Sequence, residues 1–169
     1  MRTAVIDCTR SANVKDLVNA ISPFTEYKII RFESIGLDYE LDKSIDTLVI
    51  SGSGYRSVNQ KDRNKFDGVT NLIERLDKPI LGVCFDHLII GYAYGAQLST
   101  LEKHVYDKLE QVRIIETDEI FEGYRSGEHI PLVEYHNDYV MKPGLSEAGF
   151  SLLADSPSCE VEAIKYNSK

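Results

Sequence analysis

The chain has 169 residues, a formal net charge of -8, 43% hydrophobic residues and 27% charged residues. This composition is typical of a globular domain and excludes disordered and fibrous classes. The acidic balance, with no basic run, argues against binding to a duplex phosphate backbone. The longest apolar stretch falls far short of the roughly 18 residues that a membrane span needs. We therefore expect one cytoplasmic domain over residues 1–169, with no nucleic-acid and no membrane partner.

The first half alternates short apolar runs with helical patterns. Buried strands are expected at residues 3–7, 27–32, 47–51 and 79–83. Apolar residues at helical spacing predict helices over residues 14–21 and 66–76, and Asn13 can cap the first. Strands joined by helical crossovers predict a parallel sheet that is covered by helices on both faces.

After Gln97 the pattern changes to shorter strand-like runs that are separated by loops. They lie at residues 111–115, 129–133, 150–153 and 161–164. We expect these runs to form added antiparallel strands. The predicted fold class is α/β, a flavodoxin-like arrangement with a mostly parallel central sheet, helices on both faces and added antiparallel strands.

The three cysteines, Cys8, Cys84 and Cys159, are an odd number at wide spacing without a C-x-x-C motif. This spacing indicates neither a disulfide framework nor a metal cage. Cys8 and Cys159 are expected to be core thiols. Cys84 differs, because it stands where an apolar strand passes directly into an apolar helix. Such a turn exposes the side chain, aims the next backbone N–H at a developing oxyanion and favours a thiolate, so position makes Cys84 a candidate nucleophile.

Residues 82–88, Gly-Val-Cys-Phe-Asp-His-Leu, resemble the Gly-[Val/Ile]-Cys-x-Gly-His-Gln turn of class I glutamine amidotransferases. Residues 50–54, Ile-Ser-Gly-Ser-Gly, look like the Ser-Gly-Gly-Pro loop of that family. Three later segments resemble the GMP synthase branch: Asp-Glu-Ile-Phe-Glu-Gly at 118–123, Tyr-His-Asn-Asp-Tyr-Val at 135–140 and Ser-Cys-Glu-Val-Glu-Ala-Ile-Lys at 158–165. The resemblance spans essentially the whole chain.

The resemblance implies hydrolysis of the glutamine side-chain amide through a thioester on Cys84. The ammonia would pass to an ATP-dependent synthetase partner, which in the GMP synthase branch adenylates xanthosine monophosphate. The Phe85 N–H would be one oxyanion donor, and the loop of Gly52, Ser53 and Gly54 would supply the second. No cofactor is implied.

Four departures from the family pattern bear on activity. Asp86 replaces a glycine, and a carboxylate buried there would oppose thiolate formation. Leu88 replaces a glutamine that contacts the substrate, and Ser53 and Gly54 stand where the loop has glycine and proline. The family's His-Pro-Glu segment, which carries the general base, would follow residue 165, and we expect the domain to lack it because the sequence ends at Lys169.

Several alternatives stay open. His87, three positions after Cys84, could act as a base, and His136 with Asp138 could orient an imidazole or, with a further ligand, hold a metal, although the pair also matches a family loop. Residues 51–54 could cradle a phosphate, and His104 and His129 are expected to be solvated. The alternative functions are a catalytically silent relative that binds a synthetase or small ligand, and a different cysteine chemistry with Asp86 as acid or base.

Overall fold

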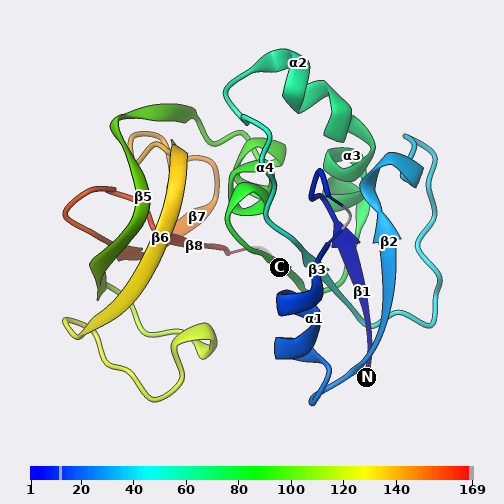
Figure 1. Ribbon diagram of the computed structural model, residues 1–169, viewed down its shortest axis with the longest axis horizontal. Helices are drawn as coiled ribbons and strands as arrows, with labels where there is room; N and C mark the ends of the chain where they lie inside the picture. Colours follow the sequence, from blue (N-terminus) through cyan, green and yellow to red (C-terminus); the bar gives the residue numbers. More distant parts are fainter. Residues whose placement is uncertain (12, 168–169) are drawn as a thin grey trace. The chain divides into compact units, whose positions relative to one another are not determined.

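The computed structural model describes residues 1–11 and 13–167, and the chain divides into two compact units. The first unit comprises Met1–Ala93 and contains a parallel sheet with four α-helices (Figure 1). The second unit begins at Tyr94 and contains an antiparallel sheet. No helix in the described ranges is both long enough and apolar enough to cross a membrane.

The sheet of the first unit has four parallel strands in the order β2-β1-β3-β4. The strands are β1 (Arg2–Asp7), β2 (Glu26–Arg31), β3 (Thr47–Ile50) and β4 (Ile80–Gly82). The α-helices are α1 (Lys15–Ile21), α2 (Gln60–Arg63), α3 (Asp67–Arg75) and α4 (Phe85–Ala93), with short 3-10 turns η1 (Phe32–Ser34) and η2 (Asn64–Phe66). The parallel sheet and its crossover helices are as the sequence predicted.

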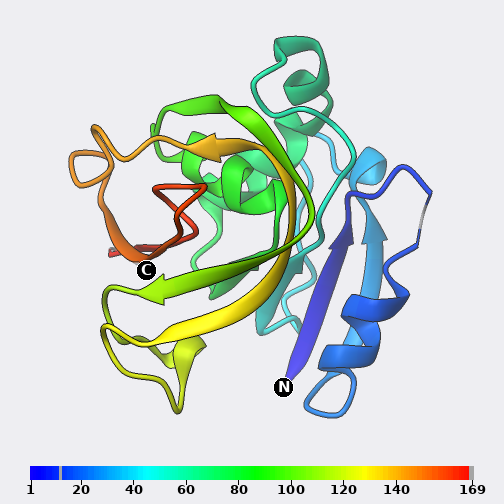
Figure 2. The same cartoon turned by 60° about the vertical axis from the view of Figure 1, so that its left-hand side comes forward.

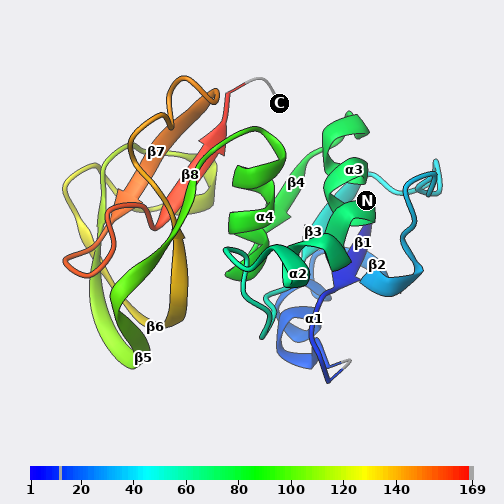
Figure 3. The same ribbon diagram turned by 90° about the horizontal axis from the view of Figure 1, so that it is seen from above.

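The strand order determines which helix covers which face. The chain moves from β1 to β2 in one direction along the sheet and from β3 to β4 in the other. Right-handed crossovers then place α1 and α3 on opposite faces, as Figure 3 shows. On the α1 side, Val5 packs against Val14 and Val18. The cap position of α1 falls on Val14, but Asn13 Oδ1 still accepts the Lys15 N–H at 3.1 Å.

The expectation that all four strands are buried is wrong for β2 and β4. The two central strands, β1 and β3, bury most of their side chains, whereas the edge strands expose apolar residues. Tyr27 and Ile29 of β2 are 43% and 47% exposed, and Leu81 of β4 is 45% exposed. The sequence could not distinguish these strands, because a short apolar run indicates a strand without indicating its neighbours.

The second unit is an antiparallel sheet in the order β6-β5-β7-β8. Its strands are β5 (Leu98–Ile114), β6 (His129–Val140), β7 (Phe150–Asp155) and β8 (Ala163–Tyr166), and η3 (Glu119–Phe121) lies between β5 and β6. Figure 2 shows β5 and β6, in green and yellow, as a long curved pair. The added antiparallel strands are confirmed, but β5 and β6 extend well beyond the predicted runs. Register shifts at residues 100–105 and 106–108 break the regular pairing of these two strands.

Candidate active site

The junction between β4 and α4 has the geometry of an exposed nucleophile turn. β4 ends at Gly82 and α4 begins at Phe85, so Cys84 lies at the turn between strand and helix. Its φ is 62°, a left-handed conformation that is uncommon for a residue other than glycine. Holding a side chain there costs on the order of 1–3 kcal/mol, and such strain clusters at functional sites. The side chain of Cys84 is exposed, as a nucleophile requires.

Gly82 permits this turn because the first turn of α4 folds back over the end of β4. A Cβ at Gly82 would lie 2.6 Å from Cδ1 of Ile90 and 2.9 Å from the backbone oxygen of Asp86. No other residue type fits this space without movement of the helix backbone. The glycine two positions before the cysteine is therefore a packing requirement of the turn.

The loop after β3 meets the turn after β4, because adjacent parallel strands end at the same edge of the sheet. The backbone N–H groups of Phe85 and Ser53 act on the Cys84 sulfur and lower the pKa of its thiol. Gly52 lies against the cysteine, since a Cβ there would be 3.1 Å from Cys84 Cβ and 3.5 Å from its Sγ. Gly54 is farther along the loop, where a Cβ would approach the Arg10 side chain at 3.7 Å.

The surroundings of Cys84 raise the pKa of its thiol above the ordinary value. The largest cause is desolvation, because protein atoms displace water from the sulfur although the residue remains accessible. The neighbouring Asp86 acts in the same direction, and the N–H groups of Phe85 and Ser53 act against it. The balance favours the thiol over the thiolate.

Asp86 is fully buried, with 0% exposure. Its Oδ1 accepts a hydrogen bond from Cys8 Sγ at 3.4 Å, and its Oδ2 has no hydrogen-bond partner among the described residues. Burial raises the pKa of this carboxyl well above the usual value. The sequence analysis considered the case of a buried carboxyl at this position, and Asp86 is buried. Burial favours the protonated, neutral form of Asp86. Only the ionised form would repel a thiolate at Cys84.

Cys8 and Asp7, at the end of β1, also border this edge of the sheet. Cys8 is buried, as expected of a core thiol, and its N–H donates to Ser51 Oγ at 2.9 Å. Burial of Asp7 opposes its ionisation, but hydrogen bonds from Thr9 and Arg31 prevail and lower its pKa. Sequence reasoning missed the contact between Cys8 and Asp86. The sequence feature that could have indicated this contact is the position of Cys8 at the carboxyl end of β1, the strand beside β3.

The remaining candidates occupy different environments. Leu88 is 7% exposed and faces the interior of the first unit, and His87 lies in the first turn of α4, where its N–H donates to the Cys84 carbonyl at 3.2 Å. In the second unit, His104 and His129 are exposed, as expected.

His136, on β6, approaches Asp138 through the backbone carbonyl, with Nδ1 at 3.3 Å, whereas the Asp138 carboxylate accepts from Thr100 Oγ1 at 3.2 Å. The carboxylate that faces His136 is Glu134, whose Oε2 lies 3.2 Å from Nε2. This partner raises the pKa of His136. Sequence reasoning missed Glu134, although residues two apart on a strand share one face.

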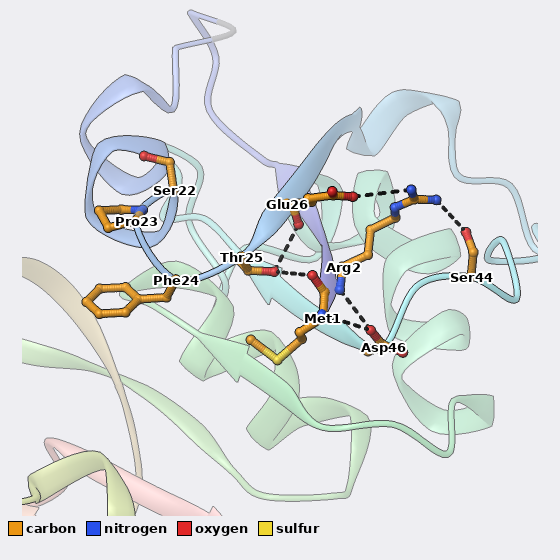
Figure 4. A pocket seen from close by; sticks show the side chains of 9 residues that line it. All are labelled: Met1, Arg2, Ser22, Pro23, Phe24, Thr25, Glu26, Ser44 and Asp46. Atoms are coloured by element: carbon orange, nitrogen blue, oxygen red, sulfur yellow. Dashed lines mark hydrogen bonds and ion pairs between the residues drawn. The ribbon is translucent and has the colours of Figure 1, made fainter.

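A depression of about 680 Å³ lies around the amino ends of β1 and β2, at the opposite end of these strands from Cys8 (Figure 4). Its polar groups already pair with one another: the Arg2 N–H donates to Asp46 at 2.8 Å, and the Arg2 guanidinium contacts Ser44 and Glu26. Ligands of open α/β sheets bind at the carboxyl ends of strands. We therefore place the candidate site at Cys84 and not at this depression.

Comparison with known proteins agrees with this geometry. The family model "Glutamine amidotransferase class-I" matches residues 4–169. A glutamine-hydrolysing GMP synthase subunit of Methanothermobacter thermautotrophicus is 39% identical over 97 residues, which are 57% of this chain and 49% of that protein. The protein of the same name from Sulfolobus acidocaldarius is 31% identical over 125 residues, which are 74% of this chain and 62% of that protein. The chain thus spans about half to three fifths of these relatives.

Solved structures show the same fold. A putative GMP synthase subunit from Thermoplasma acidophilum superposes with a TM-score of 0.82 at 22% identity, covering 100% of this chain and 79% of that one. A glutamine amidotransferase from Thermotoga maritima gives a TM-score of 0.81 at 13% identity, covering 99% of this chain and 72% of that one. With the family model matched from β1 to the end and a strained cysteine between β4 and α4, the chain belongs to the class I glutamine amidotransferase family.

Proposed function

We propose that this chain hydrolyses the side-chain amide of glutamine, with Cys84 as the nucleophile, and supplies the ammonia to an ATP-dependent synthetase. The observation that carries the proposal is the geometry of Cys84. It is exposed, strained at a φ of 62°, and approached by the N–H groups of Phe85 and Ser53. Family membership and the glutamine-hydrolysing activity in the names of the relatives support the same reaction.

In this mechanism the Cys84 sulfur attacks the side-chain carbonyl carbon of glutamine and forms a C–S bond. The carbonyl electron pair moves to oxygen, where the fixed N–H groups of Phe85 and Ser53 would donate to the new oxyanion. Collapse of this intermediate breaks the C–N bond, and the nitrogen takes up the proton that the Cys84 thiol gave up on attack and leaves as ammonia. Water then cleaves the thioester, so glutamine and water give glutamate, ammonia and the restored thiol.

The synthetase partner follows from the relatives, not from a surface of this chain. Both relatives named above are described as one subunit of a glutamine-hydrolysing GMP synthase, which implies a further subunit. We therefore assign the ammonia to a synthetase subunit of that type. Glutamine would bind beside Cys84, with the Gly52–Gly54 loop on one side and the start of α4 on the other.

The test combines turnover with covalent labelling. Glutamate and ammonia are measured with glutamine as substrate, with and without a GMP-synthase-type synthetase subunit from the same genome. The glutamine analogue 6-diazo-5-oxonorleucine is then located by mass spectrometry. We expect one label on Cys84, none on Cys8 or Cys159, and loss of label and turnover in Cys84→Ser. His104→Ala, which alters an exposed histidine, is the matched control. Absence of both ammonia and label with the partner present would refute the proposal.

A catalytically silent relative is the second candidate, and the burial of Asp86 and Leu88 favours it. These residues replace the glycine and the substrate-contacting glutamine of the family pattern, and both lie inside the fold. This candidate predicts binding to the synthetase without release of ammonia. The variants Asp86→Gly and Asp86→Gly/Leu88→Gln distinguish the two functions. Turnover that appears only in these variants would identify the native chain as silent, and turnover in the native chain would exclude that function.

A further inference from the structure

A second group of reactive side chains lies in the antiparallel unit. Its residues are distant in sequence from the Cys84 turn. His136, Cys159 and Glu162 each offer one ligand atom, and these atoms all lie within 4.8 Å of one another. Glu134 joins them, because its Oε2 is 3.2 Å from His136 Nε2. Two of the four residues come from β6, and the other two come from the connection between β7 and β8. We call these four residues the His136 cluster.

The hydrogen bonds around the cluster orient its members as metal ligands are usually oriented. His136 Nδ1 is 3.3 Å from the backbone carbonyl of Asp138, so Nδ1 can donate and leave the lone pair on Nε2, beside Glu134. Metal-binding histidines typically use one nitrogen in this way and coordinate with the other. Ser156 Oγ donates to Glu162 Oε1 at 2.6 Å and accepts the Cys159 N–H at 3.1 Å. One hydroxyl therefore positions two members of the cluster.

The charges of the cluster favour a cation. Cys159 and Glu134 are buried, with 3% and 9% exposure, and Glu162 is partly buried, so water can solvate their anionic forms only poorly. The nearby acidic residue of β5, Glu110, is also buried but is already paired with Lys108. A divalent cation would neutralise the thiolate and carboxylates, and the displaced protons would pass to solvent.

We propose that His136 Nε2, Cys159 Sγ and the carboxylates of Glu162 and Glu134 bind one divalent transition metal ion of the zinc class. Zinc bonds of about 2.0–2.3 Å imply separations of roughly 3.3–3.8 Å between tetrahedral ligands. The ligand atoms of His136, Cys159 and Glu162, which lie within 4.8 Å of one another, must therefore approach by at most about 1.5 Å. A mixed set of nitrogen, sulfur and oxygen donors suits zinc or cobalt and not magnesium or calcium. Four protein ligands make the site structural, and it ties β6 to the connection between β7 and β8.

The competing arrangement is a proton-sharing network without metal. In it Glu134 pairs with His136 and shares a proton with Glu162, and the Cys159 thiol donates to the Val161 carbonyl at 3.3 Å. The two arrangements differ in one chemical respect. Metal binding converts Cys159 to a thiolate bonded to the ion, whereas the network keeps it protonated.

Cobalt distinguishes them, because a thiolate bound to Co²⁺ gives a near-ultraviolet charge-transfer band and tetrahedral Co²⁺ absorbs strongly in the visible. The full chain carrying Cys84→Ser, which removes the exposed thiol, is freed of metal with a chelator and titrated with Co²⁺ and then with Zn²⁺. We expect both bands at one equivalent, their loss on adding zinc, and a zinc-dependent rise in the unfolding temperature. Adding Cys159→Ser should remove the charge-transfer band, whereas adding Cys8→Ser, at another buried thiol, should keep it.

A variant that keeps every ligand separates weaker metal binding from loss of folding. Ser156→Ala removes an orienting hydroxyl but no ligand, and it should weaken cobalt binding about 10- to 100-fold while the circular dichroism spectrum stays unchanged. Absence of cobalt bands in the folded, metal-free protein would overturn the proposal in favour of the proton network. A charge-transfer band that survives Cys159→Ser would overturn it as well. Neither result bears on the Cys84 reaction, since that residue is already replaced.

Discussion

Replacing Asp86 with asparagine should remove a pH dependence from the stability of the parallel unit. Burial raises the pKa of Asp86 well above its usual value, whereas in the unfolded chain an aspartate ionises near pH 3.9. Between these pKa values the folded protein holds a proton that the unfolded chain has released. The free energy of unfolding therefore falls as pH rises, by at most about 1.4 kcal/mol per pH unit, and the fall ends at the folded pKa.

From pH 5 to pH 7 this single carboxyl can lower the free energy of unfolding by up to about 3 kcal/mol. Asparagine has nearly the same shape but no proton to release, so its contribution is flat over this range. Its buried amide would lack a full set of partners, which costs roughly 1–3 kcal/mol at every pH. Asp86→Asn should thus be less stable than the native chain at pH 5 and recover up to about 3 kcal/mol relative to it by pH 7.

Urea unfolding followed by circular dichroism at pH 5, 6, 7 and 8 measures this difference. The control is Asp42→Asn, at an exposed carboxyl whose pKa is lowered by hydrogen bonds from the Ser44 N–H and hydroxyl. Its contribution changes only as pH falls below the ordinary carboxyl range, so the control difference should be flat between pH 5 and pH 8. If the Asp86→Asn difference is the same at pH 5 and pH 7, Asp86 is ionised in the folded protein and the reasoning fails.

Three further variants test the packing around the site. Gly82→Ala should lower the free energy of unfolding by about 1–3 kcal/mol in urea, because its Cβ would meet Ile90 at 2.6 Å, whereas Gly36→Ala, with open space within 4 Å, should be close to neutral. Gly52→Ala should slow labelling of Cys84 by the glutamine analogue, because its Cβ would lie 3.1 Å from that of the cysteine, with little change in the urea midpoint. Arg31→Met removes the cation 2.9 Å from the buried Asp7 carboxylate and should cost about 3–5 kcal/mol at pH 7. Because the lowered pKa of Asp7 gives stability above pH 4 that is lost on acidification, the Arg31→Met cost should shrink toward pH 3.

The strand, turn and helix around Cys84 could be predicted because their signals are local. An apolar run of strand length leads directly into an apolar helix, and each has a distinct period. The length of β5 could not be predicted in the same way. Residues 98–110 are largely polar and exposed, and the shifts near residues 100–108 interrupt the alternation that indicates a strand. Their pairing with β6 is a tertiary fact that overrides local preference.

The partners of the site residues were harder to predict than the residues themselves. Cys8 and Asp86 are separated by 78 positions and meet because β1 lies within the same sheet as β4. No local pattern specifies that contact. The contact between Glu134 and His136 could have been predicted, because residues two apart on a strand lie on the same face of the sheet. The resemblance of residues 135–140 to a family segment favoured Asp138 as the partner of His136 instead.

The contrast between Gly82 and Asp86 shows which changes the nucleophile turn tolerates. On the strand side a Cβ at Gly82 would collide with the helix backbone, so the fold requires glycine there. On the helix side Asp86 lies within α4 without a positive φ, and its carboxyl reaches Cys8 in the interior. The glycine that the family pattern has at this second position is therefore not needed for the turn to form in this chain. Asp86 leaves the backbone of the turn intact and acts on the site through charge, so its ionisation would add to the desolvation that already raises the pKa of Cys84.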